Sequence, residues 1–187
     1  ITLEYSRPSK NDRVIFGDLV PYDKMWRTGA NKNSMITVSN DLTVGSQTLK
    51  AGTYAIFVTP KNGKSWDVYF YTDTENWGTP DEWKEELVAL KTTATVSKIT
   101  SVMESFTIEI ENLTMNGADL SFAWENSKAV VSFSVPTKEN VLASIDKTMS
   151  GPAAGDYYKA ASYYLAEKIE LEKALEYINK ALAMTED

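Results

Sequence analysis

The sequence contains neither cysteine nor histidine among its 187 residues. Without cysteine the chain can form no disulfide and no thiolate nucleophile, and without both residues it lacks the usual zinc ligands. The absence of histidine also excludes every catalytic triad built on an imidazole base. No acidic loop of the EF-hand type is present. We therefore predict no metal site, no cofactor and no catalytic residue of these kinds.

Basic charge is also scarce, because 19 Lys+Arg face 26 Asp+Glu and give a formal net charge of -7. Nucleic-acid binding is not expected, since it needs clustered basic residues. No apolar run approaches the roughly 20 residues that span a bilayer, so we expect no transmembrane segment. Hydrophobic residues at 43% and charged residues at 24% are instead typical of a folded globular chain.

Before Pro136, seven short segments are rich in β-branched and aromatic residues, which favours strands. Several alternate apolar with polar residues, as in an antiparallel sheet with one buried face. Asn62-Gly63 and Asn116-Gly117 are type I′ hairpin signals, and Gly45-Ser46 is a weaker one. We predict an antiparallel β-sandwich over residues 1–136. Its strands are Leu3–Tyr5, Met35–Val38, Tyr54–Val58, Val68–Tyr71, Phe106–Ile110, Leu120–Trp124 and Val130–Val135.

Residues 80–96 fit two kinds of secondary structure. Thr79-Pro80-Asp81-Glu82 has the form of a capping box with proline at the first helical position, which marks a helix start. The threonines within Val88–Val96 favour a strand instead. We predict a short helix from Pro80 that gives way to a strand before Lys91.

After Pro136 the apolar spacing changes from two residues to about 3.6, which predicts a helical extension over residues 137–187. Thr137 can cap a first helix that Gly151-Pro152 ends, and two further helices follow at Pro152–Glu167 and Leu171–Met184. The last two resemble one tetratricopeptide (TPR) hairpin. Because a lone repeat cannot bury its own apolar face, we expect this hairpin to dock on the sandwich, on a partner or on further repeats.

The irregular stretch from Phe16 to Asn31 holds the most informative side chains. All three arginines lie in the first 27 residues, and arginine suits a planar, bidentate grip on a carboxylate. One hypothesis is an anion clamp built by Arg7 and Arg27. The structural alternative is that Trp26 plugs the end of the sandwich while Arg27 bridges an aspartate or a turn carbonyl. In that case Arg27→Ala should cost about 2–5 kcal/mol of stability.

Two other groups of residues are candidates for function. Trp77 in Asn76-Trp77-Gly78 is the tryptophan best placed to be exposed, where it could stack on a ligand, whereas Trp66 and Trp124 belong to strands and the core. The paired carboxylates Glu109/Glu111 and Glu85/Glu86 are the remaining candidates for general acid–base catalysis. They would serve a hydrolase only if a cleft brought two of them together, and a solvated surface is their ordinary role.

The chain resembles the bacterial domain-of-unknown-function family 2911. The resemblance rests on three stretches, Tyr5-Ser6-Arg7-Pro8-Ser9, Ile15–Tyr22 and Trp26-Arg27-Thr28-Gly29-Ala30-Asn31, together with Leu49–Phe57 and Asn76-Trp77-Gly78. It covers about residues 2–135 and implies an exported, periplasmic or cell-envelope protein, with which a trimmed start at Ile1 agrees. The family supplies no catalytic residues. Its motif yields the ligand-binding candidates Arg7, Trp26, Arg27, Asn31, Tyr54 and Trp77.

Three functions follow as hypotheses. The first is a non-catalytic cell-envelope module that binds a small molecule, glycan or protein partner through the Arg/Trp loop. The second is a glycoside hydrolase or other hydrolase that uses Asp and Glu only. The third is a structural or adaptor protein acting through the helical hairpin.

Overall fold

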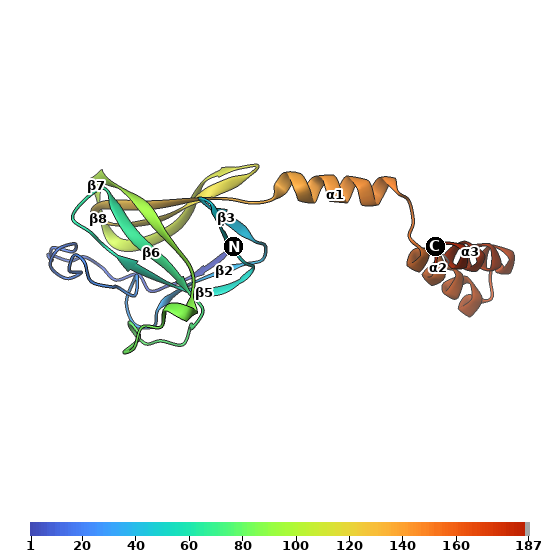
Figure 1. The fold of residues 1–187 in the computed structure, drawn as a ribbon, viewed down its shortest axis with the longest axis horizontal. Helices are drawn as coiled ribbons and strands as arrows, with labels where there is room; N and C mark the ends of the chain where they lie inside the picture. Colours follow the sequence, from blue (N-terminus) through green and yellow to red (C-terminus); the bar gives the residue numbers. More distant parts are fainter. Residues whose placement is uncertain (186–187) are drawn as a thin grey trace. The chain divides into compact units, whose positions relative to one another are not determined.

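The computed structural model describes residues 1–185. Its strands form one antiparallel sheet of eight strands (Figure 1). Neighbouring strands follow the order β1-β2-β5-β6-β7-β8-β3-β4. The chain divides into two compact units, Ile1–Pro136 and Thr137–Asp187, and every strand lies in the first. The strands are β1 Thr2–Glu4, β2 Ser34–Val38, β3 Leu42–Val44, β4 Gln47–Leu49, β5 Gly52–Thr59, β6 Ser65–Tyr71, β7 Val88–Thr114 and β8 Gly117–Ser134.

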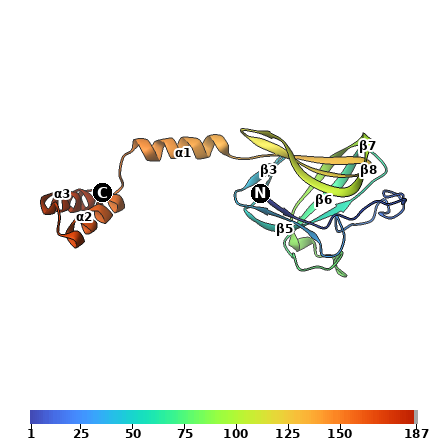
Figure 2. The same cartoon turned by 180° about the vertical axis from the view of Figure 1, so that it is seen from behind.

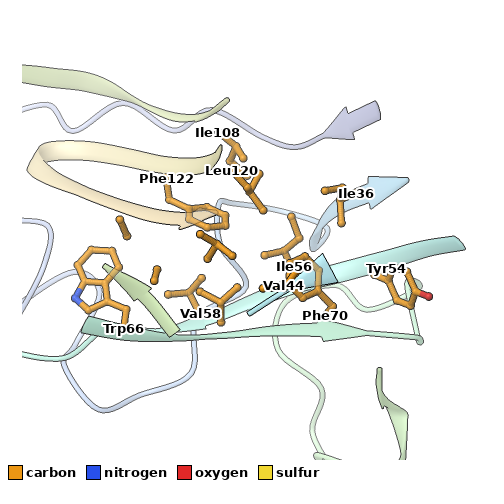
Figure 3. Packing of buried hydrophobic residues seen from close by; sticks show 14 of the residues in the cluster. Ile36, Val44, Tyr54, Ile56, Val58, Trp66, Phe70, Ile108, Leu120 and Phe122 are labelled. Atoms are coloured by element: carbon orange, nitrogen blue, oxygen red, sulfur yellow. The ribbon is translucent and has the colours of Figure 1, made fainter. Parts of the chain in front are cut away.

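The two longest strands bend, which folds the sheet over its main core. Register shifts interrupt the β7–β8 pairing between Lys98 and Thr107, and Glu125 of β8 has a φ of 54° opposite Met103. Bulges of this kind bend a strand and increase its twist. In Figure 3, Ile108, Leu120 and Phe122 from the far half of this hairpin face residues of β5 and β6 across the core. The antiparallel β-sandwich prediction is thus confirmed, with both layers formed by one continuous sheet.

Both predicted Asn-Gly hairpins are present, but their turns differ from the prediction. Five residues link β5 to β6, and Met115 and Asn116 link β7 to β8, so Gly117 already belongs to β8. Neither Gly63 nor Gly117 has a positive φ, so the type I′ assignment is wrong. The weaker signal, Gly45-Ser46, joins the two strands β3 and β4 that propensity alone did not reveal.

The predicted helix from Pro80 is wrong, because residues 72–87 cross the second face of the sheet as an irregular segment. The only helical residues in it are the 3-10 turn η1, Glu85–Leu87, after which β7 begins at Val88. The ring of Trp83 stacks on that of Tyr71 with 4.4 Å between the ring centroids. It meets the rings of Phe57 and Tyr69 edge-on, each with 5.5 Å between the centroids. Burying this indole against three aromatic rings outweighs the local capping preference. The predicted strand before Lys91 is confirmed.

Three helices form the second unit, as predicted: α1 Thr137–Met149, α2 Ala154–Glu167 and α3 Leu171–Ala183 (Figure 2). Helices α2 and α3 pack as a hairpin through small residues, since Ala161, Ala174 and Ala181 are buried. An apolar groove of about 370 Å³ lies along them, lined among others by Tyr158, Leu165 and Leu175. Among residues 1–185, no helix combines the length and apolar character needed to cross a membrane.

Candidate functional site

The loop that runs from Pro8 to Asn31 is fastened to the bent part of β7 and β8. The Lys10 amide donates to the Glu104 carbonyl at 2.6 Å, and the Ile15 amide donates to the Glu125 carboxylate at 3.3 Å. At the other end of the loop, Trp26 exchanges two backbone hydrogen bonds with Val58 of β5, at 2.8 and 3.0 Å. These contacts hold an otherwise irregular segment in one place.

Trp26 closes the end of the core, as the structural hypothesis predicts. Its ring stacks on Trp124 with 6.0 Å between the ring centroids, and it meets the rings of Phe106 at 5.0 Å and Phe16 at 6.1 Å. Phe16 in turn contacts the ring of Trp66. The indole Nε1 of Trp26 donates to the Gly29 carbonyl at 3.2 Å, which satisfies its polar atom. This aromatic cluster fixes the backbone that carries Arg27.

The residues after Arg27 adopt an unusual backbone conformation. Thr28 is fully buried with a φ of 58°, which is strained for a β-branched residue and costs about 1–3 kcal/mol. Gly29 has a φ of 147°, and a Cβ there would lie 3.0 Å from the Ser34 hydroxyl and 3.2 Å from the Ser6 carbonyl. The loop therefore needs glycine at this position to keep its shape beside Arg27.

A pocket of about 350 Å³ opens between this loop and Trp124. Three of its lining residues are cationic, none is acidic, and most of the others are apolar. The lining residues are Pro8, Arg13, Leu19, Val20, Pro21, Lys24, Met25, Trp26, Arg27, Gly29, Ala30 and Trp124. A local excess of three positive charges in a chain of net charge -7 favours an anionic ligand.

Arg27 is the unusual cation of this set. Its Nε is buried and has no hydrogen-bond partner, and no described carboxylate, Asp18 and Asp23 included, pairs with its guanidinium. Its Nη1 lies against Gly78, where an added Cβ would come within 3.3 Å. A buried, unpaired donor on a charged group is unfavourable, so an anion that reached this guanidinium would find it without a competing partner.

The other two cations of the pocket differ from Arg27. The guanidinium of Arg13 is exposed and already donates to the carbonyls of Lys10 and Ser9. The Lys24 side chain is exposed and forms no ion pair with the described residues. Both therefore contribute charge at the rim, where water screens it, while Arg27 contributes it at the wall.

The structure places the candidates Arg7 and Asn31 beside the pocket but outside its lining. Arg7 donates from Nε to the Phe106 carbonyl at 3.2 Å and from Nη2 to the Thr107 hydroxyl at 3.0 Å. Asn31 donates from its amide to the Ser6 hydroxyl at 3.3 Å. Both side chains tie the N-terminal segment to its neighbours, so the clamp of two arginines is not formed in this structure.

The candidates Tyr54 and Trp77 lie elsewhere. Tyr54 is buried, donates its hydroxyl to the Lys50 carbonyl at 2.9 Å, and sits at the end of the core opposite Trp66 (Figure 3). Trp77 is 77% exposed, as predicted, and precedes the Gly78 that touches Arg27, but its ring does not line the pocket. Of the six candidates, the pocket brings together Trp26 and Arg27.

Sequence reasoning did not single out Asn33, Arg13 or Lys24. Asn33 is 3% exposed, and neither its amide nitrogen nor its amide oxygen has a partner. Its backbone amide donates to the carbonyl of Asn76, two residues before the Gly78 that lies against Arg27. A Lys-Asn-Ser stretch at a strand start carries no signal of burial, so only the fold could reveal this residue.

The candidate carboxylates do not converge on a pocket. Glu111 pairs with Lys128 at 2.7 Å, and Glu85 accepts a hydrogen bond from the Trp83 indole. The four pockets described in the structure contain a single carboxylate between them, that of Glu109. Within residues 1–185, no group of three or more Asp and Glu side chains is arranged to hold a metal ion. These four pockets therefore offer no pair of carboxylates to a hydrolase mechanism.

The stretch that forms this pocket and its sheet is also the part that matches a known family. The family model described as "Protein of unknown function (DUF2911)" matches residues 1–133. The chain belongs to the DUF2911 family. The predicted resemblance is thus confirmed, and the match ends at the last residues of β8, before the helical unit begins. No curated protein and no solved structure matches the chain.

Proposed function

We propose that this DUF2911 protein is a non-catalytic binding module whose ligand is a small molecule with a negatively charged group. The observation that carries the proposal is Arg27, whose buried Nε has no partner and whose guanidinium no described carboxylate neutralises. Arg13 and Lys24 add positive charge to the same pocket, and its lining contains no acid. Binding an anion would supply the counter-charge that the fold does not provide.

The pocket's construction supports binding rather than catalysis. Its volume of about 350 Å³ is at the small end of ligand sites, and it lies between a loop and Trp124, both anchored to the sheet. No nucleophile–base pair lines it. The groove on α2 and α3 carries no second proposal, since nothing in the structure indicates what covers it.

We also propose an exported, cell-envelope setting, which rests on the family resemblance alone. Fractionation of cells that express the natural gene provides the test. Recovery of the protein only from the cytoplasmic fraction would refute this part of the proposal and leave the binding site unaffected.

A thermal-shift screen tests the binding function on the full chain. The panel contains carboxylates, sulfates, phosphates and acidic sugars at constant ionic strength. We expect at least one anion to raise the melting temperature by a few degrees, because a ligand that binds only the folded state stabilises it. Arg27→Gln should abolish the shift, whereas Lys64→Gln removes the same charge from an exposed site outside this pocket and should retain it. Silence of the whole panel, or an equal response in Arg27→Gln, would refute the function.

A further inference from the structure

We infer that the anion bound in this pocket is a monocarboxylate with a small apolar body, such as a short aliphatic or aromatic acid. The inference rests on the proposed function and specifies its ligand class. Three features of the lining carry it: a single unengaged guanidinium, the absence of a helix N-terminus among the lining residues, and an apolar wall.

The positive charge that Arg27 places at the wall of the pocket suits a ligand group with two oxygen atoms. Arg27 is the cation whose guanidinium is unengaged and partly buried, while Arg13 already donates to two carbonyls and Lys24 lies at the exposed rim. One planar guanidinium can bind one planar carboxylate through two parallel hydrogen bonds. A phosphate dianion has three or more oxygens to satisfy and carries a second charge.

Phosphate sites depend on backbone donors, and half of the lining residues of this pocket offer no free backbone N–H group. Phosphates are commonly bound by several N–H groups from a helix N-terminus or a glycine-rich nest, and no helix end contributes to this lining. Pro8 and Pro21 have no N–H group. The amides of Arg13, Leu19, Val20 and Trp26 donate to backbone carbonyls, and both indoles donate to carbonyls as well.

The remaining wall favours an apolar body. Five apolar residues close together in the sequence line the pocket: Leu19, Val20, Pro21, Met25 and Trp26. Leu19 is 44% exposed, an amount of open apolar surface that a ligand could cover. The small volume limits the body to a ring or a short chain.

Isothermal titration of the full chain with a matched series tests the ligand class. The probes are phenylacetate, hexanoate, phenylacetamide, phenyl phosphate and inorganic phosphate, at constant ionic strength. We expect phenylacetate to bind at least about tenfold more tightly than phenylacetamide, which has the same shape without the charge. Phenyl phosphate should bind more weakly than phenylacetate. Arg27→Lys keeps the charge but loses the bidentate geometry and should weaken phenylacetate binding by about tenfold.

Each other result has a distinct meaning. If phenyl phosphate or inorganic phosphate binds more tightly than the carboxylates and Arg27→Met abolishes that binding, the anion pocket stands and the monocarboxylate inference is wrong. If phenylacetamide binds as well as phenylacetate, charge is irrelevant and both proposals fail. If none of the probes binds, the inference fails, and the proposed function fails with it only when the wider anion panel is also silent.

Discussion

At the scale of single residues, the main result concerns what holds Arg27. Sequence reasoning offered a carboxylate clamp with Arg7 and a structural tie to an aspartate or a turn carbonyl. In the structure the Arg7 side chain is engaged with Phe106 and Thr107, while the Arg27 guanidinium has no hydrogen-bond or ion-pair partner among the described residues. The two arginines thus have opposite roles: one fastens the chain, and the other carries a charge that its own fold leaves uncompensated.

This contrast predicts that the same substitution, arginine to methionine, affects stability to different degrees at the two positions. Arg27→Met keeps the aliphatic stem and removes an unpaired buried donor, so we expect the stability of the unliganded protein to change by no more than about 1 kcal/mol. Arg7→Met removes hydrogen bonds to two partners and should cost about 1–3 kcal/mol. Urea denaturation of both variants provides the measurement. A loss of about 2 kcal/mol or more in Arg27→Met would instead support the structural tie.

At the scale of elements, the 72–87 segment and the β7–β8 hairpin show how tertiary contacts override local signals. Residues 79–82 have a helix-start motif, yet the segment is irregular because Trp83 packs on Phe57, Tyr69 and Tyr71. The predicted strands Leu120–Trp124 and Val130–Val135 are two parts of one strand, β8, which continues through the bend at Glu125.

Two tryptophans of the 72–87 segment provide a matched test of its packing. Trp83→Ala should destabilise the protein by about 3 kcal/mol, because it removes a ring that covers three aromatic side chains of the sheet. Trp77→Ala should change stability by less than about 0.5 kcal/mol, since that ring is 77% exposed. Thermal denaturation of both variants measures the difference. Similar effects of the two substitutions would contradict the packing described here.

The β7–β8 hairpin also contains a carboxylate that should make stability depend on pH. The Asp119 carboxylate accepts hydrogen bonds from the Ser132 hydroxyl and the Asn112 amide. Both bonds lower the pKa of Asp119, and the bond from Ser132 has the larger effect. As pH falls, the Asp119 carboxylate therefore takes up its proton more readily in the unfolded state than in the folded state. Its contribution to the free energy of unfolding is present above the pKa of the unfolded state and is lost as pH falls through the pKa of the folded state. Asp119→Asn should be less stable than wild type at neutral pH, with the gap closing in acid. A gap that stays constant in a series of pH-dependent melts would exclude this contribution.

At the scale of the whole molecule, the chain consists of two units with very different interiors. All residues of the main core lie between Ile15 and Phe133, within the stretch that the family model matches. The helical unit buries three alanines, none of them in α1. The docking of its hairpin on the sheet unit, on a partner or on further repeats stays a prediction.

The two interiors predict different behaviour of the isolated fragments. Residues 1–136 should fold alone and unfold cooperatively, because the fragment retains the complete core. Residues 137–187 should be partly helical and melt gradually, since short helices with little buried surface are marginal in water. Circular dichroism melts of both fragments make the comparison. A non-cooperative melt of fragment 1–136 would show that the sheet needs the helical unit.

The sequence by itself determined the local patterns of this protein. Content of β-branched and aromatic residues identified seven strand segments, and a spacing of 3.6 residues identified three helices within two residues of their observed starts. The motif around Trp26-Arg27 identified the family. These features depend on neighbours in the chain, so they can be read from the order of residues.

The tertiary structure alone decided how these pieces combine. The single folded sheet, the short strands β3 and β4, the irregular path before Trp83 and the pocket around Arg27 all depend on contacts between distant residues. The Arg27 pocket, for example, joins a loop near the N-terminus to Trp124 of β8. Pairing register, bends and burial arise from such distant contacts, whose free energy outweighs the local preferences that a sequence displays.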